Sequence, residues 1–321
     1  MLQRQKLATL HGLALHCGYP AIGNKTARVK AIEESCFSVN TQPLNILSID
    51  IGIKNFSYAK LSYAGVPAKS IGLFDWNHVN LHNRFGLPEA NSSTSLSKSY
   101  MAQLAVSVVD QILLGEWVPS LILMESQRTR SNTNSATLPN VLLNYTLEHM
   151  IYAAFAARQH THPAFKDVPI VATNSTKMVN FWINRFVNKD KRMTATFSKK
   201  LRAGLLFGWL SDAKSSPIDL SELSSRLPDD FASFSYRKKV SAFLDSFSFE
   251  TSPGKADDLV DCLLYNIASY QQLRHHLELQ PYIKEEKDVE ELVHRWDESH
   301  IAYVKPVVDE FDLEFRPEYA S

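Results

Sequence analysis

Carboxylates occupy the positions from which this sequence could do chemistry. Asp50 and Glu125 each close a short aliphatic run, and Asp257, Asp258 and Asp261 open a helix near the end of the chain. Residues three or four apart on a helix are neighbours, so Asp261 shares a face with Asp258 or with Asp257. An ionised carboxylate among aliphatic side chains is costly unless it is paired or binds a cation. The five acids therefore predict a cation-binding site.

The type of ligand indicates the cation and the reaction. Oxygen ligands without a supporting cysteine or histidine favour Mg²⁺, for which Mn²⁺ should substitute. Two such ions close together clamp the attacking water and the leaving oxygen of a phosphodiester, which is nuclease chemistry. We expect Asp50, Glu125, Asp261 and one of the adjacent Asp257 and Asp258 to hold two Mg²⁺ ions. Simpler alternatives stay open: the helical acids could be first-turn residues that stabilise the helix dipole, and Asp50 could be a turn residue.

Hydrophobic periodicity predicts an α/β domain that would position these acids. Three strands joined by short turns form an antiparallel meander, and two later strands alternate with helices, so those two should be parallel and buried. The predicted order is βββαβαβα, with a poorly periodic insertion at about 211–254. We expect strands at 45–51, 56–63, 70–78, 121–124 and 169–173, and helices at 99–115, 141–158, 176–187 and 256–279. Ligands gather beyond the carboxyl ends of strands in such sheets, so Asp50 and Glu125 should face one crevice.

The segments around the acids resemble the motifs of a known enzyme family. Residues 46–55 (ILSIDIGIKN), 123–130 (LMESQRTR) and 255–264 (KADDLVDCLL) are similar, in order and spacing, to the three acidic motifs of the fungal mitochondrial Holliday junction resolvases. These are relatives of bacterial RuvC. The resemblance implies a ribonuclease H-like fold, a mixed five-stranded sheet flanked by helices.

The same resemblance implies roles for single residues. It assigns the family's functional acids to Asp50, Glu125, Asp261 and one of the two adjacent aspartates. The Asp-x-x-Asp spacing of RuvC favours Asp258, although geometry also permits Asp257. The implied activity is that of a magnesium-dependent crossover junction endodeoxyribonuclease. It would act as a homodimer on four-way DNA junctions during mitochondrial DNA recombination, which places the protein in mitochondria.

The chain divides into four predicted parts. Residues 1–36 resemble the SAP helix-extended-loop-helix motif, which binds DNA, although an amphipathic hairpin packed on the body is an equal alternative. Residues 37–44 form a linker, and 45–280 form the catalytic domain. Residues 281–321 are expected to be an acidic and partly disordered tail. A less favoured alternative is that this tail mimics DNA and occupies a basic groove.

Charge is distributed unevenly along the chain. The 34 basic and 34 acidic residues cancel overall, but residues 1–250 carry a net charge of +9 and residues 251–321 a net charge of −9. A basic body of this kind suits a nucleic-acid partner. The alternative is a solvated helical surface. The residues expected to contact DNA are Lys25, Lys54, Arg128, Arg130, Lys189, Lys191, Arg192, Lys199, Lys200 and Arg202.

Several other classes of protein are disfavoured. No apolar run is long enough for a transmembrane helix, so no membrane partner is expected. The three cysteines have no C-x-x-C spacing, which argues against a disulfide framework and a cysteine zinc site. An actin- or sugar-kinase-like ATPase would need more glycine-rich phosphate loops than 11 glycines allow. A non-catalytic protein that binds DNA junctions remains the main alternative.

Overall fold

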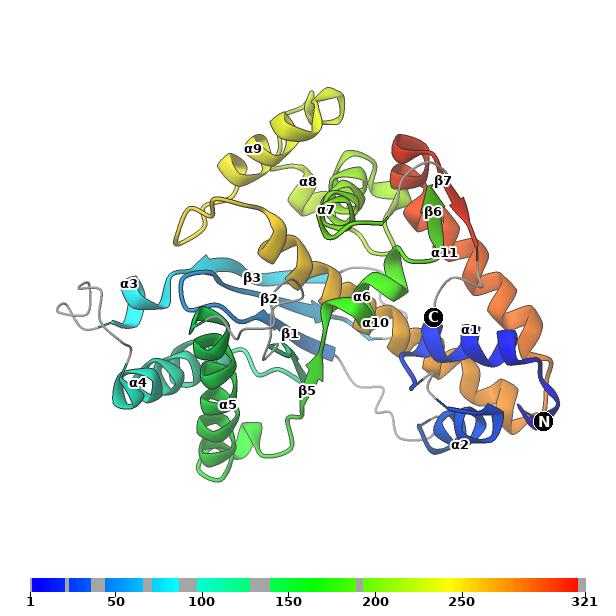
Figure 1. Cartoon of the computed structure of the whole chain (residues 1–321), viewed down its shortest axis with the longest axis horizontal. Coiled ribbons are helices and arrows are strands. Elements are labelled where there is room, and N and C mark those ends of the chain that lie inside the picture. The colour runs from blue at the N-terminus through cyan, green and yellow to red at the C-terminus, as the bar shows by residue number, and fades with distance from the viewer. Residues whose placement is uncertain are drawn as a thin grey trace.

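A five-stranded mixed sheet forms the centre of the molecule. The computed structural model describes residues 2–20, 23–35, 44–65, 71–86, 97–127, 139–188 and 193–316. The strand order is β3-β2-β1-β4-β5, with β1–β2–β3 antiparallel and β4 and β5 parallel to β1, which confirms the predicted fold class (Figure 1). The strands are β1 Leu44–Asp50, β2 Phe56–Tyr63, β3 Ile71–Val79, β4 Leu121–Glu125 and β5 Ile170–Thr173.

Helices cover both faces of this sheet. α4 and α5 pack on one face against Leu47, Ile49 and Met124, whereas α7 and α10 lie on the other face, where Ile46 and Leu123 point. Successive strand residues alternate between faces, so the acids that end β1 and β4 point toward α10. The helices are α1 Leu7–Cys17, α2 Lys25–Ser35, α3 Leu81–Phe85, α4 Lys98–Val108, α5 Pro139–Gln159, α6 Ser175–Trp182, α7 Ala195–Ser211, α8 Ser221–Ser224, α9 Tyr236–Ser246, α10 Asp257–Lys284 and α11 Val289–Phe311.

Buried polar side chains anchor α10 to the sheet. The Asn266 amide donates to the Ile46 carbonyl at 2.8 Å and accepts from the Tyr63 hydroxyl at 2.9 Å. The Ser48 hydroxyl donates to the Cys262 carbonyl at 2.8 Å. These directional bonds set the rotation and the height of α10 above β1 and β2. The helix therefore begins near the carboxyl ends of β1 and β4.

Some predicted boundaries are wrong. α6 starts behind an Asn174 cap but ends at Trp182, and β6 (Phe186–Asn188) follows in an antiparallel pair with β7 (Leu313–Phe315). The helix predicted to run to Val187 therefore ends at Trp182. Residues 186–188 form β6 instead, because they pair with β7 near the end of the chain. The insertion at 211–254 contains α8, α9 and short 3₁₀ turns.

The N-terminal helices and the acidic C-terminal segment pack together. Leu10 and Ile32 of α1 and α2 share a buried cluster with Leu279 of α10 and Trp296 of α11, and the four helices gather at one end of the molecule (Figure 1). The DNA-binding role of the SAP-like segment stays a prediction. The prediction of a partly disordered tail is wrong for residues 289–316, because α11 buries an apolar stripe. Most of its acids are exposed, whereas Asp297 pairs with the buried side chains of Arg185 and His16. Among the described residues, no helix combines the length and hydropathy needed to cross a membrane.

Candidate active site

Asp50 and Glu125 meet at the carboxyl ends of two adjacent parallel strands. The register pairs Ile49 of β1 with Met124 of β4, one residue before each acid. The side chains of Asp50 and Glu125 are hydrogen-bonded to each other, which contributes to the raised pKa of Asp50. The turn after β1 requires Gly52, because a Cβ there would lie 2.7 Å from the Asn55 carbonyl oxygen. The tight turn leaves the end of β1 accessible to the side chains of α10.

Asp258 and Asp261 in the first turns of α10 complete a group of four carboxylates. Both contribute to the repulsion that raises the pKa of Asp50. Asp257 is held differently, since its Oδ2 accepts a hydrogen bond from Lys199 Nζ at 2.9 Å. The geometry thus favours Asp258 over Asp257 as the partner of Asp50 and Glu125.

The electrostatics of the group are those of like charges taken out of water. Burial, and then the charges of Glu125, Asp258 and Asp261, raise the pKa of Asp50 well above its usual range. Burial is also the largest cause of the raised pKa values of Glu125, Asp258 and Asp261. A positive ion beside these four acids would favour their ionised forms.

Arg202 of α7 is not the surface DNA contact that the sequence predicts. Its Nε and Nη2 donate to the two carboxylate oxygens of Asp261 at 2.7 and 2.9 Å, and its Nη1 donates to Ser198 Oγ at 3.0 Å. The guanidinium is buried because α7 packs tightly against α10. That prediction is wrong for Arg202 because its partner is an acid of the site rather than a phosphate.

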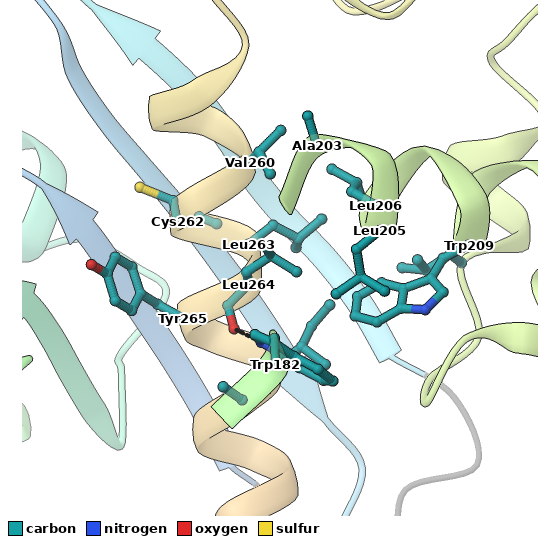
Figure 2. Packing of buried hydrophobic residues seen from close by; sticks show 14 of the residues in the cluster. Trp182, Ala203, Leu205, Leu206, Trp209, Val260, Cys262, Leu263, Leu264 and Tyr265 are labelled. Atoms are coloured by element: carbon teal, nitrogen blue, oxygen red, sulfur yellow. Dashed lines mark hydrogen bonds between the residues drawn. The ribbon is translucent and has the colours of Figure 1, made fainter. Parts of the chain in front are cut away.

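Two residues near the acids were missed from the sequence. Tyr265 points from α10 away from the α7 side chains (Figure 2), and the pKa of its hydroxyl is raised by burial and then by Glu125. It follows Asp261 by four residues, a spacing that could have revealed it. Glu148 of α5 is also buried, and its Oε2 accepts a hydrogen bond from the Gln127 amide at 2.8 Å.

The other predicted DNA contacts lie in several places. Lys54 is exposed in the turn after Asp50, and Lys25 begins α2. Lys199 flanks the acids through Asp257, while the Lys200 ammonium lies 4.9 Å from the centre of the Phe311 ring. The remaining five residues lie outside the described residues: Arg128, Arg130, Lys189, Lys191 and Arg192.

The acids fit a hard divalent cation by donor type. Within the part of the chain that the structure describes, no three Asp, Glu, His or Cys side chains are already arranged to hold a metal ion. Asp50 is hydrogen-bonded to Glu125, and Asp261 is held by Arg202. A cation between the carboxylates would relieve their repulsion, and an all-oxygen donor set is what Mg²⁺ and Mn²⁺ prefer.

The comparisons with known proteins agree with this arrangement. Residues 46–279, which include every acid of the site, match the catalytic-domain model described as "Mitochondrial resolvase Ydc2 / RNA splicing MRS1". The chain belongs to this family. The resemblance seen in the sequence motifs is thereby confirmed.

Curated relatives and a solved structure support the family membership. The chain is 30% identical over 198 residues to the mitochondrial cruciform cutting endonuclease 1 of Schizosaccharomyces pombe, covering 61% of this chain and 71% of the relative. It is 20% identical over 304 residues to the Saccharomyces cerevisiae protein of the same name, covering 85% and 84%. The crystal structure of the yeast mitochondrial Holliday junction resolvase Ydc2 has the same fold, with a TM-score of 0.55 and 21% identity, over 87% of this chain and 98% of that chain.

Proposed function

We propose that this protein is a mitochondrial endonuclease that resolves four-way DNA junctions by metal-dependent hydrolysis of phosphodiester bonds. The observation that carries the proposal is the meeting of four buried or half-buried carboxylates from β1, β4 and α10 in a member of the Ydc2 family. Relatives named as mitochondrial cruciform cutting endonucleases support both the substrate and the location.

Asp50, Glu125, Asp258 and Asp261 would hold the metal. Bound Mg²⁺ would supply an activated water and neutralise charge that develops on the phosphate. The carboxylates come from three different elements, so the rigid sheet and α10 fix their relative positions before DNA arrives. Such prior positioning lowers the cost of assembling the site around the scissile phosphate.

Basic residues around the acids would hold the DNA. Lys54 is exposed in the turn after β1, and Lys199 on α7 pairs with Asp257. Arg128 and Arg130 follow Glu125 closely in sequence and are further candidates. We also propose a homodimer, because a two-fold symmetric enzyme suits the cutting of two opposed strands in a junction.

The test uses a labelled synthetic four-way junction, a linear duplex of the same sequence, and Mg²⁺ or Mn²⁺. The wild type should cut opposed strands of the junction and leave the duplex intact. Asp50→Asn should bind the junction in EDTA but cut at least about 10³-fold more slowly, since a lost metal ligand costs several kcal/mol in the transition state. Equal cutting of linear duplex would contradict resolution, and full activity of Asp50→Asn would contradict the mechanism.

A non-catalytic junction-binding protein is the alternative, and the family description itself includes an RNA-splicing protein. The intact acids favour the enzyme, because four buried or half-buried carboxylates have no evident purpose in a protein that only binds. Tight junction binding without cutting in either metal would favour the alternative. The family assignment leaves no basis for the ATPase considered from the sequence.

A further inference from the structure

Arg202 makes a two-pronged contact with one acid of the site. Its Nε–Asp261 Oδ1 and Nη2–Asp261 Oδ2 distances are 2.7 and 2.9 Å, so each carboxylate oxygen receives one hydrogen bond. The third nitrogen of the guanidinium, Nη1, donates to Ser198 Oγ on the same helix. All three nitrogens thus have a partner inside the protein, which leaves no free fork for a phosphate.

The burial of this pair separates it from an ordinary surface ion pair. The side chains of Arg202 and Asp261 are 7% and 10% exposed, whereas Lys199, one turn earlier on α7 and paired with Asp257, is 47% exposed. Leu201 and Leu205, on either side of Arg202 along α7, are fully buried. The guanidinium is therefore held by the packing of α7 as well as by its hydrogen bonds.

The planar guanidinium of Arg202, with its two hydrogen bonds, restricts the orientation of the Asp261 carboxylate. Each carboxylate oxygen can accept two hydrogen bonds or metal contacts, so the contact with Arg202 leaves one lone pair on each oxygen of Asp261. In metal sites, partners of this kind orient the ligand, and their loss typically weakens metal binding about 10- to 100-fold. A lysine, which is a single point charge, cannot replace the fork.

We propose that Arg202 is a positioning residue, whose bidentate contact orients Asp261 so that its remaining lone pairs face the cation held with Asp50, Glu125 and Asp258. The inference rests on the metal site of the proposed function. It assigns to Arg202 a role in metal affinity that is independent of DNA.

The first experiment measures Mn²⁺ binding to the full-length protein without DNA, from the electron paramagnetic resonance signal of free Mn²⁺. Arg202→Gln should bind Mn²⁺ about 10- to 100-fold more weakly than the wild type. Arg202→Lys should show a similar loss, since it keeps the charge but not the fork. The control Lys214→Gln removes an exposed cation from the 3₁₀ turn that follows α7 and should change the affinity less than about threefold. Wild-type affinity in Arg202→Lys, or tighter binding in Arg202→Gln, would overturn the proposal.

Two further measurements separate orientation from damage and from DNA contact. In an Asp261→Asn background, Arg202→Gln should cause no additional loss of Mn²⁺ affinity, and an additional loss would show general disruption and sink the proposal. Junction affinity in EDTA should depend on salt with the same slope in Arg202→Gln as in the wild type. A salt slope in Arg202→Gln that is smaller than the wild-type slope by about one would show instead that Arg202 contacts a phosphate.

The proposed function can fail separately from this inference. Mn²⁺ binding that follows the predicted pattern without junction cleavage would overturn the endonuclease but keep the role of Arg202. Normal cleavage with unchanged Mn²⁺ affinity in Arg202→Gln would overturn only the role of Arg202.

Discussion

The Asn266 side chain donates to the Ile46 carbonyl at 2.8 Å and accepts from the Tyr63 hydroxyl at 2.9 Å, which ties the middle of α10 to β1 and β2. Asn266→Ala would leave both partners buried without these bonds. Each orphaned group costs about 1–3 kcal/mol, so the free energy of unfolding should fall by about 2–6 kcal/mol. Urea unfolding checks this value. The exposed Lys284→Ala in the same helix serves as control and should change stability by less than about 0.5 kcal/mol; similar effects of both changes would contradict the anchoring role.

The choice between the adjacent aspartates can be made by substitution. Asp258→Asn should reduce junction cleavage in Mg²⁺ by about 10³-fold or more, because it removes a carboxylate that faces Asp50. Asp257→Asn should reduce cleavage by less than about 10-fold, because it breaks only the exposed pair with Lys199. Single-turnover cleavage rates distinguish the two, and the reverse ranking would make Asp257 the ligand.

The crowded acids should make the metal-free protein sensitive to pH. Burial and neighbouring carboxylates raise the pKa of Asp50 in the folded protein, so the folded state binds this proton more tightly than the unfolded chain does. The resulting stability is complete below the ordinary pKa of about 4 and is lost as the pH rises through the raised value. In EDTA, Asp50→Asn should therefore be more stable than the wild type by an amount that grows with pH. A difference that stays constant between pH 5 and 8 would contradict this.

A group of buried histidines should make the stability of the folded protein depend on pH in the opposite direction. Burial and then Arg185 hold the pKa of His300 well below its usual range, and the pKa values of His16 and His275 are also lowered, with burial as the largest cause. The unfolded chain then binds protons that the folded protein does not, so stability is present above about pH 6.5 and is lost as the pH falls below it.

His300→Gln tests this linkage. Between pH 6.5 and 5, the slope of the unfolding free energy against pH should decrease by an amount that corresponds to up to about one bound proton, since one titrating group has been removed. The exposed His294→Gln on α11 is the matched control and should leave the slope unchanged. An unchanged slope in His300→Gln would show that this histidine does not contribute.

Lys54 provides a test of DNA contact beside the acids. It is exposed in the turn that follows Asp50, so its ammonium group is accessible to a phosphate. Lys54→Gln should weaken junction binding for all sequences alike and reduce the salt slope by about one. Fluorescence anisotropy over a range of salt concentrations measures both. An unchanged slope would place Lys54 away from the DNA.

The sheet and the acids were predictable because their signals are local. Asp50 and Glu125 end apolar runs, and alternation along β1 and β4 decides which face each acid points to. The aspartates in the sequence indicate where the first turn of α10 begins. The resemblance of three short motifs was enough to order these elements into one fold.

The errors concern partners that are distant in sequence. Arg202 was assigned to DNA because it lies in a basic run, whereas its partner Asp261 is 59 residues later. The end of α6 depends on β7, far along the chain. The acidic segment was judged by its charge, although the spacing of Leu292, Trp296 and Val304 on α11 could have shown its buried stripe.

α10 is a continuous helix of 28 residues that starts among the acids of the candidate site and ends in the core of the N-terminal helices. Asp258 and Leu279 are 21 residues apart, which corresponds to about 32 Å along a straight helix. That length equals roughly nine base pairs of duplex DNA. The helix thus fixes the distance between this group of acids and the N-terminal helices: if α2 binds DNA, as the sequence predicts, a DNA arm held there would reach the acids at a set distance.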